Sequence, residues 1–216
     1  QLASISKLNH ELVTKQYEGY RELQKLLEKE AISILSVRNL TDEQKNRLET
    51  YFEEQIFPVL TPMAIDAYRS FPMLLNKSIN LAVELTTAQD PEEHPVKSAI
   101  VQVPALLDRF IQIGNGHQYI LLEDMISHFI YKLFHGFRVR SITEFRITRN
   151  ADMTIHEEGA RDLLEVIENE LKKRKWGAAV RLEVRADKYE DAMVKRLTEA
   201  LEVHQDDLYI VDGALD

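Results

Sequence analysis

The sequence contains no cysteine among its 216 residues. Disulfide bonds, thiolate nucleophiles and cysteine-ligated zinc are therefore excluded as parts of this chain. The absence is consistent with a reducing compartment, and no basic segment followed by an apolar stretch opens the chain as a signal peptide would. No apolar run approaches the roughly 20 residues that a membrane-spanning helix needs. We expect a cytoplasmic location, with association at a membrane surface left open, and no membrane-spanning segment.

Glycine and proline are also scarce, with 7 and 6 residues. Because these residues interrupt helices and strands, their scarcity predicts a folded chain with mostly regular structure. Basic residues are outnumbered, with 27 Lys and Arg against 36 Asp and Glu and a net charge of −9. General binding of nucleic acid depends on neutralising many phosphates. We therefore expect no nucleic-acid partner, and any anion binding must be local.

The sequence shows no catalytic or nucleotide-binding motif. Its one glycine cluster is Gly114–Gly116, and a phosphate-binding loop would also need a following lysine and a serine or threonine at a helix start. We interpret the cluster as a hairpin turn. The seven histidines are scattered, whereas a metal site needs at least three convergent ligands. The sequence therefore predicts no catalytic, nucleotide-binding or metal-binding residue in this chain.

Helical patterns dominate the first part of the chain. Apolar residues recur every three or four positions from Leu2 to Leu27, which predicts one long amphipathic helix ending near Glu30. A lone helix cannot bury such a stripe, so its partners are expected elsewhere in the chain or upstream of it. Thr41 and Gln44 form the pattern of a capping box. The helix that follows is expected to end at Pro58 and to turn four residues inward: Leu48, Tyr51, Phe52 and Ile56.

Later segments alternate between strand and helix patterns. Strands are expected at Ile79–Leu85, Ala99–Val103, Phe110–Ile113, Tyr119–Leu122, Phe145–Thr148, Val180–Val184 and Leu208–Val211. Helices are expected at Asp124–Phe134, Glu157–Lys175 and Tyr189–Leu201, with an exposed loop at Asp90–Pro95. This order predicts an α+β fold: a two-layer α/β sandwich with a mixed sheet covered largely on one face, preceded by a long helix from a helical bundle. Both ends look cut from something longer, so we interpret the chain as a fragment.

One predicted strand carries an unusual concentration of positive charge. If the strand is continuous, Val139 shares a face with Phe145 and Ile147. The opposite face then carries three arginines: Arg138, Arg140 and Arg146. Such a face favours contact with phosphates or with a carboxylate-rich partner through bidentate bonds. The alternative is that these arginines pair with the excess acidic residues of this chain, which we favour because charge stripes are usually solvated or internally paired.

Several strings of the sequence, taken together and in order, resemble the bacterial polyphosphate kinase family. They are Pro58–Asp66, Asn76–Val83, Ala99–Pro104, Ile120–Asp124, Phe145–Asp152, Val180–Val184 and Asp207–Gly213. Ala214 departs from the pattern, because the family often has proline there. The resemblance implies two regions: residues 1–36 as the last helix of the helical N-terminal domain, and residues 37–216 as the middle, or head, domain.

The resemblance implies a parent enzyme that reversibly transfers the terminal phosphate of ATP to polyphosphate, with Mg²⁺ and through a phosphohistidine. The histidines, arginines and metal-binding positions of that chemistry belong to C-terminal domains whose motifs are missing here, and the family's adenine-contacting string is also missing. No catalytic residue is carried over, and this fragment alone is expected to be inactive and to bind neither ATP nor Mg²⁺. Polyphosphate would be a partner only of the full-length enzyme.

The role that the resemblance implies for the head domain is structural. It includes packing against the other domains of the kinase and contact between subunits in a homo-oligomer. On this hypothesis, Arg138, Arg140 and Arg146 meet a partner subunit or line an approach to the polyphosphate tunnel. The alternative from another class is a stand-alone protein–protein interaction module with the same fold and no kinase activity.

Overall fold

The computed structural model describes residues 1–65, 71–87, 97–150 and 177–215. Its helices are α1 (Leu2–Lys29), α2 (Asp42–Tyr51), α3 (Leu122–Phe129) and α5 (Asp191–Leu201). Its strands are β1 (Ile32–Ile34), β2 (Met63–Ile65), β3 (Ile79–Thr87), β4 (Lys97–Gln102), β5 (Phe110–Gln112), β6 (His117–Leu121), β7 (Phe137–Arg149), β8 (Ala179–Arg185) and β9 (Leu208–Val211). The predicted loop Asp90–Pro95 and the predicted helix Glu157–Lys175 lie outside the described residues.

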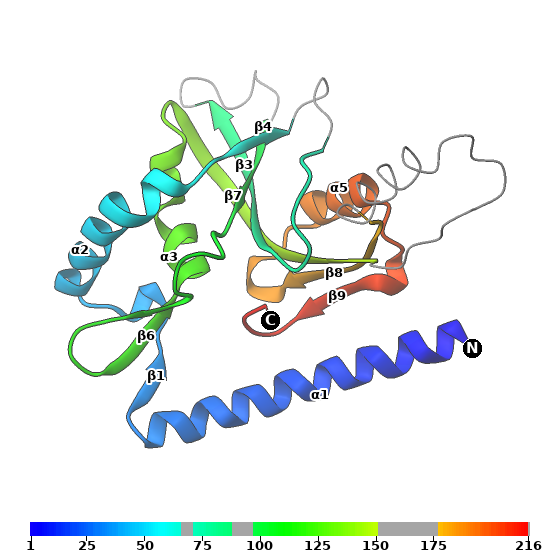
Figure 1. The fold of residues 1–216 in the computed structure, drawn as a ribbon, viewed down its shortest axis with the longest axis horizontal. Coiled ribbons are helices and arrows are strands. Elements are labelled where there is room, and N and C mark those ends of the chain that lie inside the picture. Colours follow the sequence, from blue (N-terminus) through cyan, green and yellow to red (C-terminus); the bar gives the residue numbers. More distant parts are fainter. Residues whose placement is uncertain (66–70, 88–96, 151–176, 216) are drawn as a thin grey trace, which may run out of the picture.

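The described strands form two mixed sheets (Figure 1). The larger sheet has the order β2-β4-β3-β7-β8-β9, and its β8–β9 pair is parallel while its other pairs are antiparallel. The smaller has the order β1-β6-β5, in which β1 and β6 are parallel and β5 and β6 antiparallel. The predicted α+β class with mixed strand directions and a long leading helix is confirmed. The structure adds the division of the strands between two sheets.

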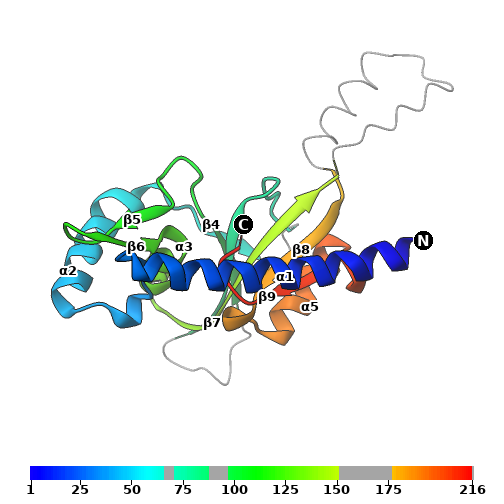
Figure 2. The same ribbon diagram turned by 90° about the horizontal axis from the view of Figure 1, so that it is seen from below.

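The long helix α1 runs beneath both sheets (Figure 2). It spans Leu2–Lys29, as its apolar periodicity predicts. At Ala31 the backbone takes a positive φ of 57°, which ends the helix and turns the chain into β1. The sequence pattern missed β1, because its three residues carry no alternation long enough to recognise. Parallel pairing of Ile32–Ile34 with β6 is a tertiary contact.

The capping box at the start of α2 is present in full. The Gln44 amide donates to the Thr41 hydroxyl at 3.2 Å, and the Thr41 amide donates to the Gln44 side chain at 2.9 Å. After Tyr51 the helix widens into a π-helical turn, Phe52–Ile56, before a 3₁₀ turn at Phe57–Val59. The predicted inward position of Tyr51 is wrong, since Tyr51 is 37% exposed. Position 51 lies beside the buried stripe of the helix, and this residue faces outward.

We expect Thr41→Ala to lower the free energy of unfolding by about 1 kcal/mol. The substitution removes the hydroxyl that accepts from the Gln44 amide, leaving that donor without a protein partner. Urea unfolding followed by circular dichroism would measure the change. Thr41→Ser keeps the hydroxyl and is the matched control. A loss as large for serine as for alanine would contradict the capping argument.

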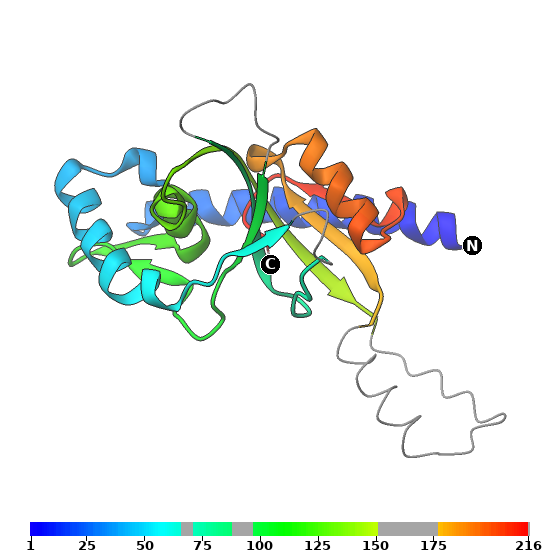
Figure 3. The ribbon, with the colours of Figure 1, turned by 90° about the horizontal axis from the view of Figure 1, so that it is seen from above.

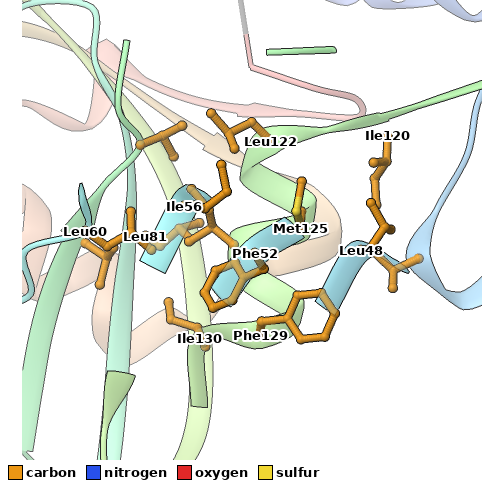
Figure 4. Packing of buried hydrophobic residues seen from close by; sticks show 14 of the residues in the cluster. Leu48, Phe52, Ile56, Leu60, Leu81, Ile120, Leu122, Met125, Phe129 and Ile130 are labelled. Atoms are coloured by element: carbon orange, nitrogen blue, oxygen red, sulfur yellow. The ribbon is translucent and has the colours of Figure 1, made fainter. Parts of the chain in front are cut away.

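The first hydrophobic core lies between α2, α3 and one face of the larger sheet. Figure 4 shows its centre, where Phe52 from the π-helical turn meets Phe129 and Met125 from α3. The rings of Phe52 and Phe129 are 5.2 Å apart between centroids. The sheet contributes the odd-numbered residues of β3 and β4, among them Leu81 and Val101, which are fully buried. This core joins the smaller sheet, through Ile111 and Ile120, to the larger one.

A second core covers the opposite face of the larger sheet. Even-numbered residues of β3 and β4, Ala82 and Ile100, pack there with Phe145 of β7. Helix α5 closes this side with Met193, Val194, Leu197 and Leu201 (Figure 3). Helices therefore lie on both faces of this sheet, which corrects the expectation that it is covered largely on one face. Cover on both faces explains why its central strands are buried on both sides and show little polar alternation.

Candidate functional site at the junction of the long helix and the sheets

Helix α1 has one buried face and one exposed apolar face. Val13 and Tyr17 are buried in a small cluster with Tyr209 and Val211 of β9 and with Leu215. The outward side is apolar and exposed, and its large residues are Leu2, Ile5, Leu8, Leu12, Leu23, Leu26 and Leu27. Exposure of these leucines and isoleucine ranges from 41% to 83%. These residues form two groups, toward the two ends of the helix, and exposed apolar surface of this extent is typical of a surface that packs against another element.

Polar contacts hold the inner face of α1 to β9. The Asn9 side-chain amide donates to the Tyr209 hydroxyl at 2.7 Å. The His10 ring stacks on Tyr209, with centroids 4.0 Å apart and an interplanar angle of 9°. From the other side, the Arg181 guanidinium lies 4.1 Å from the Tyr209 ring centroid. Tyr209 is thus held between the helix and the sheet.

The segment after β9 is also fastened to α1. The Tyr17 hydroxyl donates to the Ala214 carbonyl at 3.0 Å, and Arg21 forms an ion pair with Asp212. A Cβ at Gly213 would lie 2.8 Å from the Tyr17 ring, so glycine permits this close approach. The helix and the end of the larger sheet therefore form one packed unit.

Arg109 links the smaller sheet to the same segment. Its Nε and Nη2 donate to Glu123 Oε1 at 2.9 and 2.6 Å, and its Nη2 also donates to the Leu215 carbonyl. Glu123 is fully buried at the start of α3. Its Oε2 has no hydrogen-bond partner among the described residues. Arg109 therefore bonds both to the start of α3 and to the segment that follows β9.

A buried charge cluster lies where α3 meets the larger sheet. Lys188 Nζ donates to Asp124 at 2.7 Å and to Glu144 at 2.6 Å, while Arg185 Nη1 donates to Asp124 at 2.8 Å and to Glu144 at 3.4 Å. Glu144 is fully buried, and the side chains of Asp124, Arg185 and Lys188 are 14–16% exposed. Two acids thus share two bases, and these four residues come from three distant parts of the chain. Arg185 also pairs with Asp187, which is 62% exposed.

The pKa values of Asp124 and Glu144 are shifted in opposite directions by their surroundings. Burial raises the pKa of Glu144, and the two cations offset only part of this effect. For Asp124 burial also acts to raise the pKa, but Lys188 and Arg185 together outweigh it and lower the pKa below its ordinary value of 3.8. Asp124 therefore remains ionised to lower pH than Glu144 does. Its carboxylate is the persistent anion of the cluster.

We expect Asp124→Asn to destabilise the fold at neutral pH and to make little difference in strong acid. Because the folded-state pKa of Asp124 is lowered, its contribution is present above pH 3.8 and is lost as the pH falls through the folded pKa. Urea unfolding of both proteins at pH 7, 5 and 3 would measure this. A difference that grew as the pH fell would contradict the assignment.

The arginines of β7 do not share one strand face, which corrects the sequence prediction. The register between β3 and β7 shifts between Glu84 and Leu85, so Arg140 is an extra residue without a partner across the strand pair. This β-bulge reverses the faces of the preceding residues. Val139 consequently packs on the first core, whereas Phe145 and Ile147 belong to the second. A sequence pattern that assumes a continuous strand cannot detect an inserted residue.

The three arginines also differ in their partners. Arg146 donates to Glu183 Oε2 at 3.3 Å, across the β7–β8 pair. Arg138 and Arg140 are exposed and form no ion pair within the described ranges. Arg146 thus pairs with an acidic residue of this chain, as the favoured interpretation of the arginines predicted. Arg138 and Arg140 remain available, and a role for the three as an interface or anion contact stays a prediction.

The histidines that the structure describes are not gathered into a group that could hold a metal ion. Burial and then Lys45 lower the pKa of His128, with Glu49 acting in the opposite direction. Within the described parts of the chain, no group of three or more His, Asp or Glu residues is placed to hold a metal ion. No described helix is long and apolar enough to cross a membrane.

Sequence reasoning missed the residues that join the two sheet regions: Arg109, Glu123, Asp124, Glu144, Arg185 and Lys188. No local pattern marks them, because each lies among other charged residues of an ordinary strand or helix end. One usable signal is that Glu144 directly precedes the apolar alternation that begins at Phe145, within the buried middle of the strand. A charged residue within a buried strand needs a partner.

Comparisons with known proteins bear directly on this arrangement. Residues 43–216 match the family model described as the polyphosphate kinase middle domain. The chain belongs to the polyphosphate kinase family. It is 58% identical over 221 aligned positions to a polyphosphate kinase from Bacillus anthracis, and 52% identical to one from Halalkalibacterium halodurans. All of the chain is covered in both comparisons, but only 32% and 31% of these relatives.

The fold agrees with a solved structure of the family. The crystal structure of the polyphosphate kinase from Porphyromonas gingivalis matches 98% of this chain with a TM-score of 0.75 at 19% identity. The match covers 31% of that protein. This polyphosphate kinase chain thus spans about a third of the length of its relatives and carries their middle domain. The boundary predicted between residues 1–36 and 37–216 stays a prediction.

Proposed function

We propose that this chain is a structural unit of a polyphosphate kinase, which orients the other domains of the enzyme and contributes to contact between subunits. The family membership supports this proposal. A second support is the junction just described, in which α1 is fastened to β9 and to the segment that follows. A rigid connection between a long helix and a sheet is suited to positioning neighbouring domains.

The observation that carries the proposal is the exposed apolar stripe of α1. Val13 and Tyr17 are the apolar residues that α1 buries against the sheet. Its outer leucines have no partner among the described residues and would cost free energy if they stayed in water. A further domain of the same kinase, such as the helical bundle that the sequence predicts, is the partner that we propose for them.

In this proposal, the phosphoryl transfer takes place in the parts of the enzyme that this chain does not span. ATP, Mg²⁺ and the phosphohistidine would belong to those domains, and this chain alone would neither bind nor transfer phosphate. Polyphosphate would be met only by the complete enzyme. The support is that the motifs of that chemistry, as the family resemblance implies them, do not occur in the 216 residues.

Incubating the 216-residue chain with γ-labelled ATP and Mg²⁺ tests the proposed absence of activity. We expect neither labelled protein nor labelled polymer. The full-length kinase, incubated in the same way, is the positive control. Acid-labile label on a histidine of the isolated chain would overturn the proposal, because it would place a nucleophile inside this domain.

Substitution of the outer stripe tests the proposed scaffold role. We expect Leu8→Glu together with Leu12→Glu to abolish correct assembly and polymer synthesis in the full-length kinase, while the isolated chain keeps its unfolding midpoint. Lys25→Glu, at an exposed position away from the stripe, changes the net charge equally and is the control. Full activity and unchanged assembly of the double variant would refute the role given to the stripe.

The exposed arginines Arg138 and Arg140 of β7 are proposed as a second contact, with a partner subunit or with an approaching anion. Arg138→Glu together with Arg140→Glu would test this in the full-length kinase, since both side chains are exposed and the fold does not depend on their pairing. We expect weaker subunit association or slower chain elongation. An enzyme unchanged in both respects would show that these arginines serve neither purpose.

A further inference from the structure

A groove of about 670 Å³ lies between α2 and the β5–β6 hairpin. Its helical wall includes Arg47, Leu48 and Tyr51, and its other wall includes Phe110 and Gln112 of β5. The volume is within the range of clefts that bind ligands. The groove lies at the edge of the smaller sheet and is lined by no residue of α1 or of the charge cluster described above, although Phe110 also lines a neighbouring cavity with Tyr17 and Tyr20 of α1.

One wall of this groove is the free edge of a β-strand. β5 lies at the end of the order β1-β6-β5 and pairs with β6 alone among the described strands. The Ile113 amide donates to Gln118 and the Leu122 amide to the Arg109 carbonyl, both at 2.8 Å. In an antiparallel ladder, residues whose amide and carbonyl groups point toward the partner strand alternate with residues whose amide and carbonyl groups point away from it. The main-chain groups of Phe110 and Gln112 therefore point away from β6 and along the groove.

The side chains beside this edge are suited to an apolar contact. Phe110 is 52% exposed and Tyr51 is 37% exposed, on opposite walls. Leu48 and Ile111, which are buried, form the floor. An open strand edge beside a helix, with exposed aromatic rings, is the arrangement in which an extended peptide adds a strand to a sheet. Main-chain bonds provide the affinity and alternate side chains the selectivity.

The charges of the groove favour a basic ligand. Glu43 is balanced by Arg47, whose Nη2 lies 2.8 Å from Glu43 Oε1. Asp108 also lines the groove, is exposed, and has no ion pair within the described residues. The groove therefore has one uncompensated acid. Because the whole chain carries −9, a second copy of this chain is electrostatically disfavoured as the occupant.

We propose that this groove binds an extended segment of a partner protein that adds a strand to β5 and places a lysine or arginine beside Asp108. The apolar side chains of that segment would contact Phe110 and Tyr51. This inference is separate from the proposed scaffold role, since the lining of the groove includes no residue of the exposed side of α1 and none of the cluster of Asp124 and Glu144.

Selection of a phage-displayed library of random peptides on the 216-residue chain tests this inference. We expect enriched peptides that alternate apolar and polar residues and carry Lys or Arg. Gln112→Pro removes an outward amide from an edge strand, where proline is tolerated, and is expected to weaken binding about tenfold. Gln112→Ala keeps that amide and loses the same side chain, so it is the matched control and should bind as the wild type does.

Two further measurements make the result independent of the proline variant. Amide hydrogen exchange at Phe110 and Gln112 should slow when an enriched peptide is added, and Asp108→Lys should weaken the basic peptides. The inference is overturned if no peptide is enriched, if the proline variant folds and binds normally, or if these two amides are not protected. It is equally overturned if Gln112→Pro breaks a dimer of the chain, because a second copy would then be the occupant.

Discussion

Phe52→Ala is expected to lower the free energy of unfolding by about 3–5 kcal/mol. Phe52 is fully buried and contacts the rings of Phe57 and Phe129. Alanine would leave a cavity at the point where α2, α3 and the larger sheet meet (Figure 4). Small domains have about 5–15 kcal/mol of stability in total. Much of the chain's stability therefore depends on this one ring, and urea unfolding would measure the loss.

Tyr51→Ala is the matched control for this substitution. Tyr51 precedes Phe52 on the same helix but is 37% exposed, so its removal leaves no closed cavity. We expect a loss of less than about 1 kcal/mol. Equal losses at the two positions would indicate that helix propensity, rather than packing against α3, determines the effect.

Glu144→Ala is expected to lower the free energy of unfolding by about 3 kcal/mol. The substitution removes the fully buried acid of the cluster, so Lys188 keeps only Asp124 as a partner, while Arg185 keeps Asp124 and the more exposed Asp187. Removing one partner of a buried ion pair is costly, because the remaining charge stays away from water without it, even though the intact cluster itself stabilises the fold only modestly. Urea unfolding at pH 7 would give the value.

The exposed pair of Glu43 and Arg47 provides the comparison. Both side chains are more than 70% exposed, so Glu43→Ala is expected to cost less than about 1 kcal/mol. Glu144→Ala combined with Lys188→Met removes one charge of each sign and should recover part of the loss. If the double variant were less stable than the sum of the two single changes predicts, the lost carboxylate partner of Lys188 would not be the cause.

The elements that local chemistry determines were predicted well. The capping box at Thr41 depends on residues three positions apart, and the turn at Gly114 requires a positive φ that glycine readily adopts. The periodicity of α1 likewise predicted its length. In each case the interacting groups are close in the chain, so the pattern contains the information.

The arrangement of β7 could not be predicted in the same way. Whether Arg138 lies on the face of Arg146 depends on the bulge at Arg140, and the bulge exists only in relation to β3. Equally, Glu144 forms an ion pair with Lys188 only because the pairing of β7 with β8 places Glu144 close to the segment after β8. Nothing within a few residues of these positions specifies either outcome.

By itself, the sequence determined the α+β class, the long amphipathic helix, most strand positions and, through its resemblance, the family. These properties depend on periodicity, caps and composition, which act over a few residues, or on strings that relatives share. Only the tertiary structure decided that the strands form two sheets, that one face of α1 stays exposed and that β5 offers a free edge. Those features arise from pairing between distant segments, whose free energies depend on the whole fold.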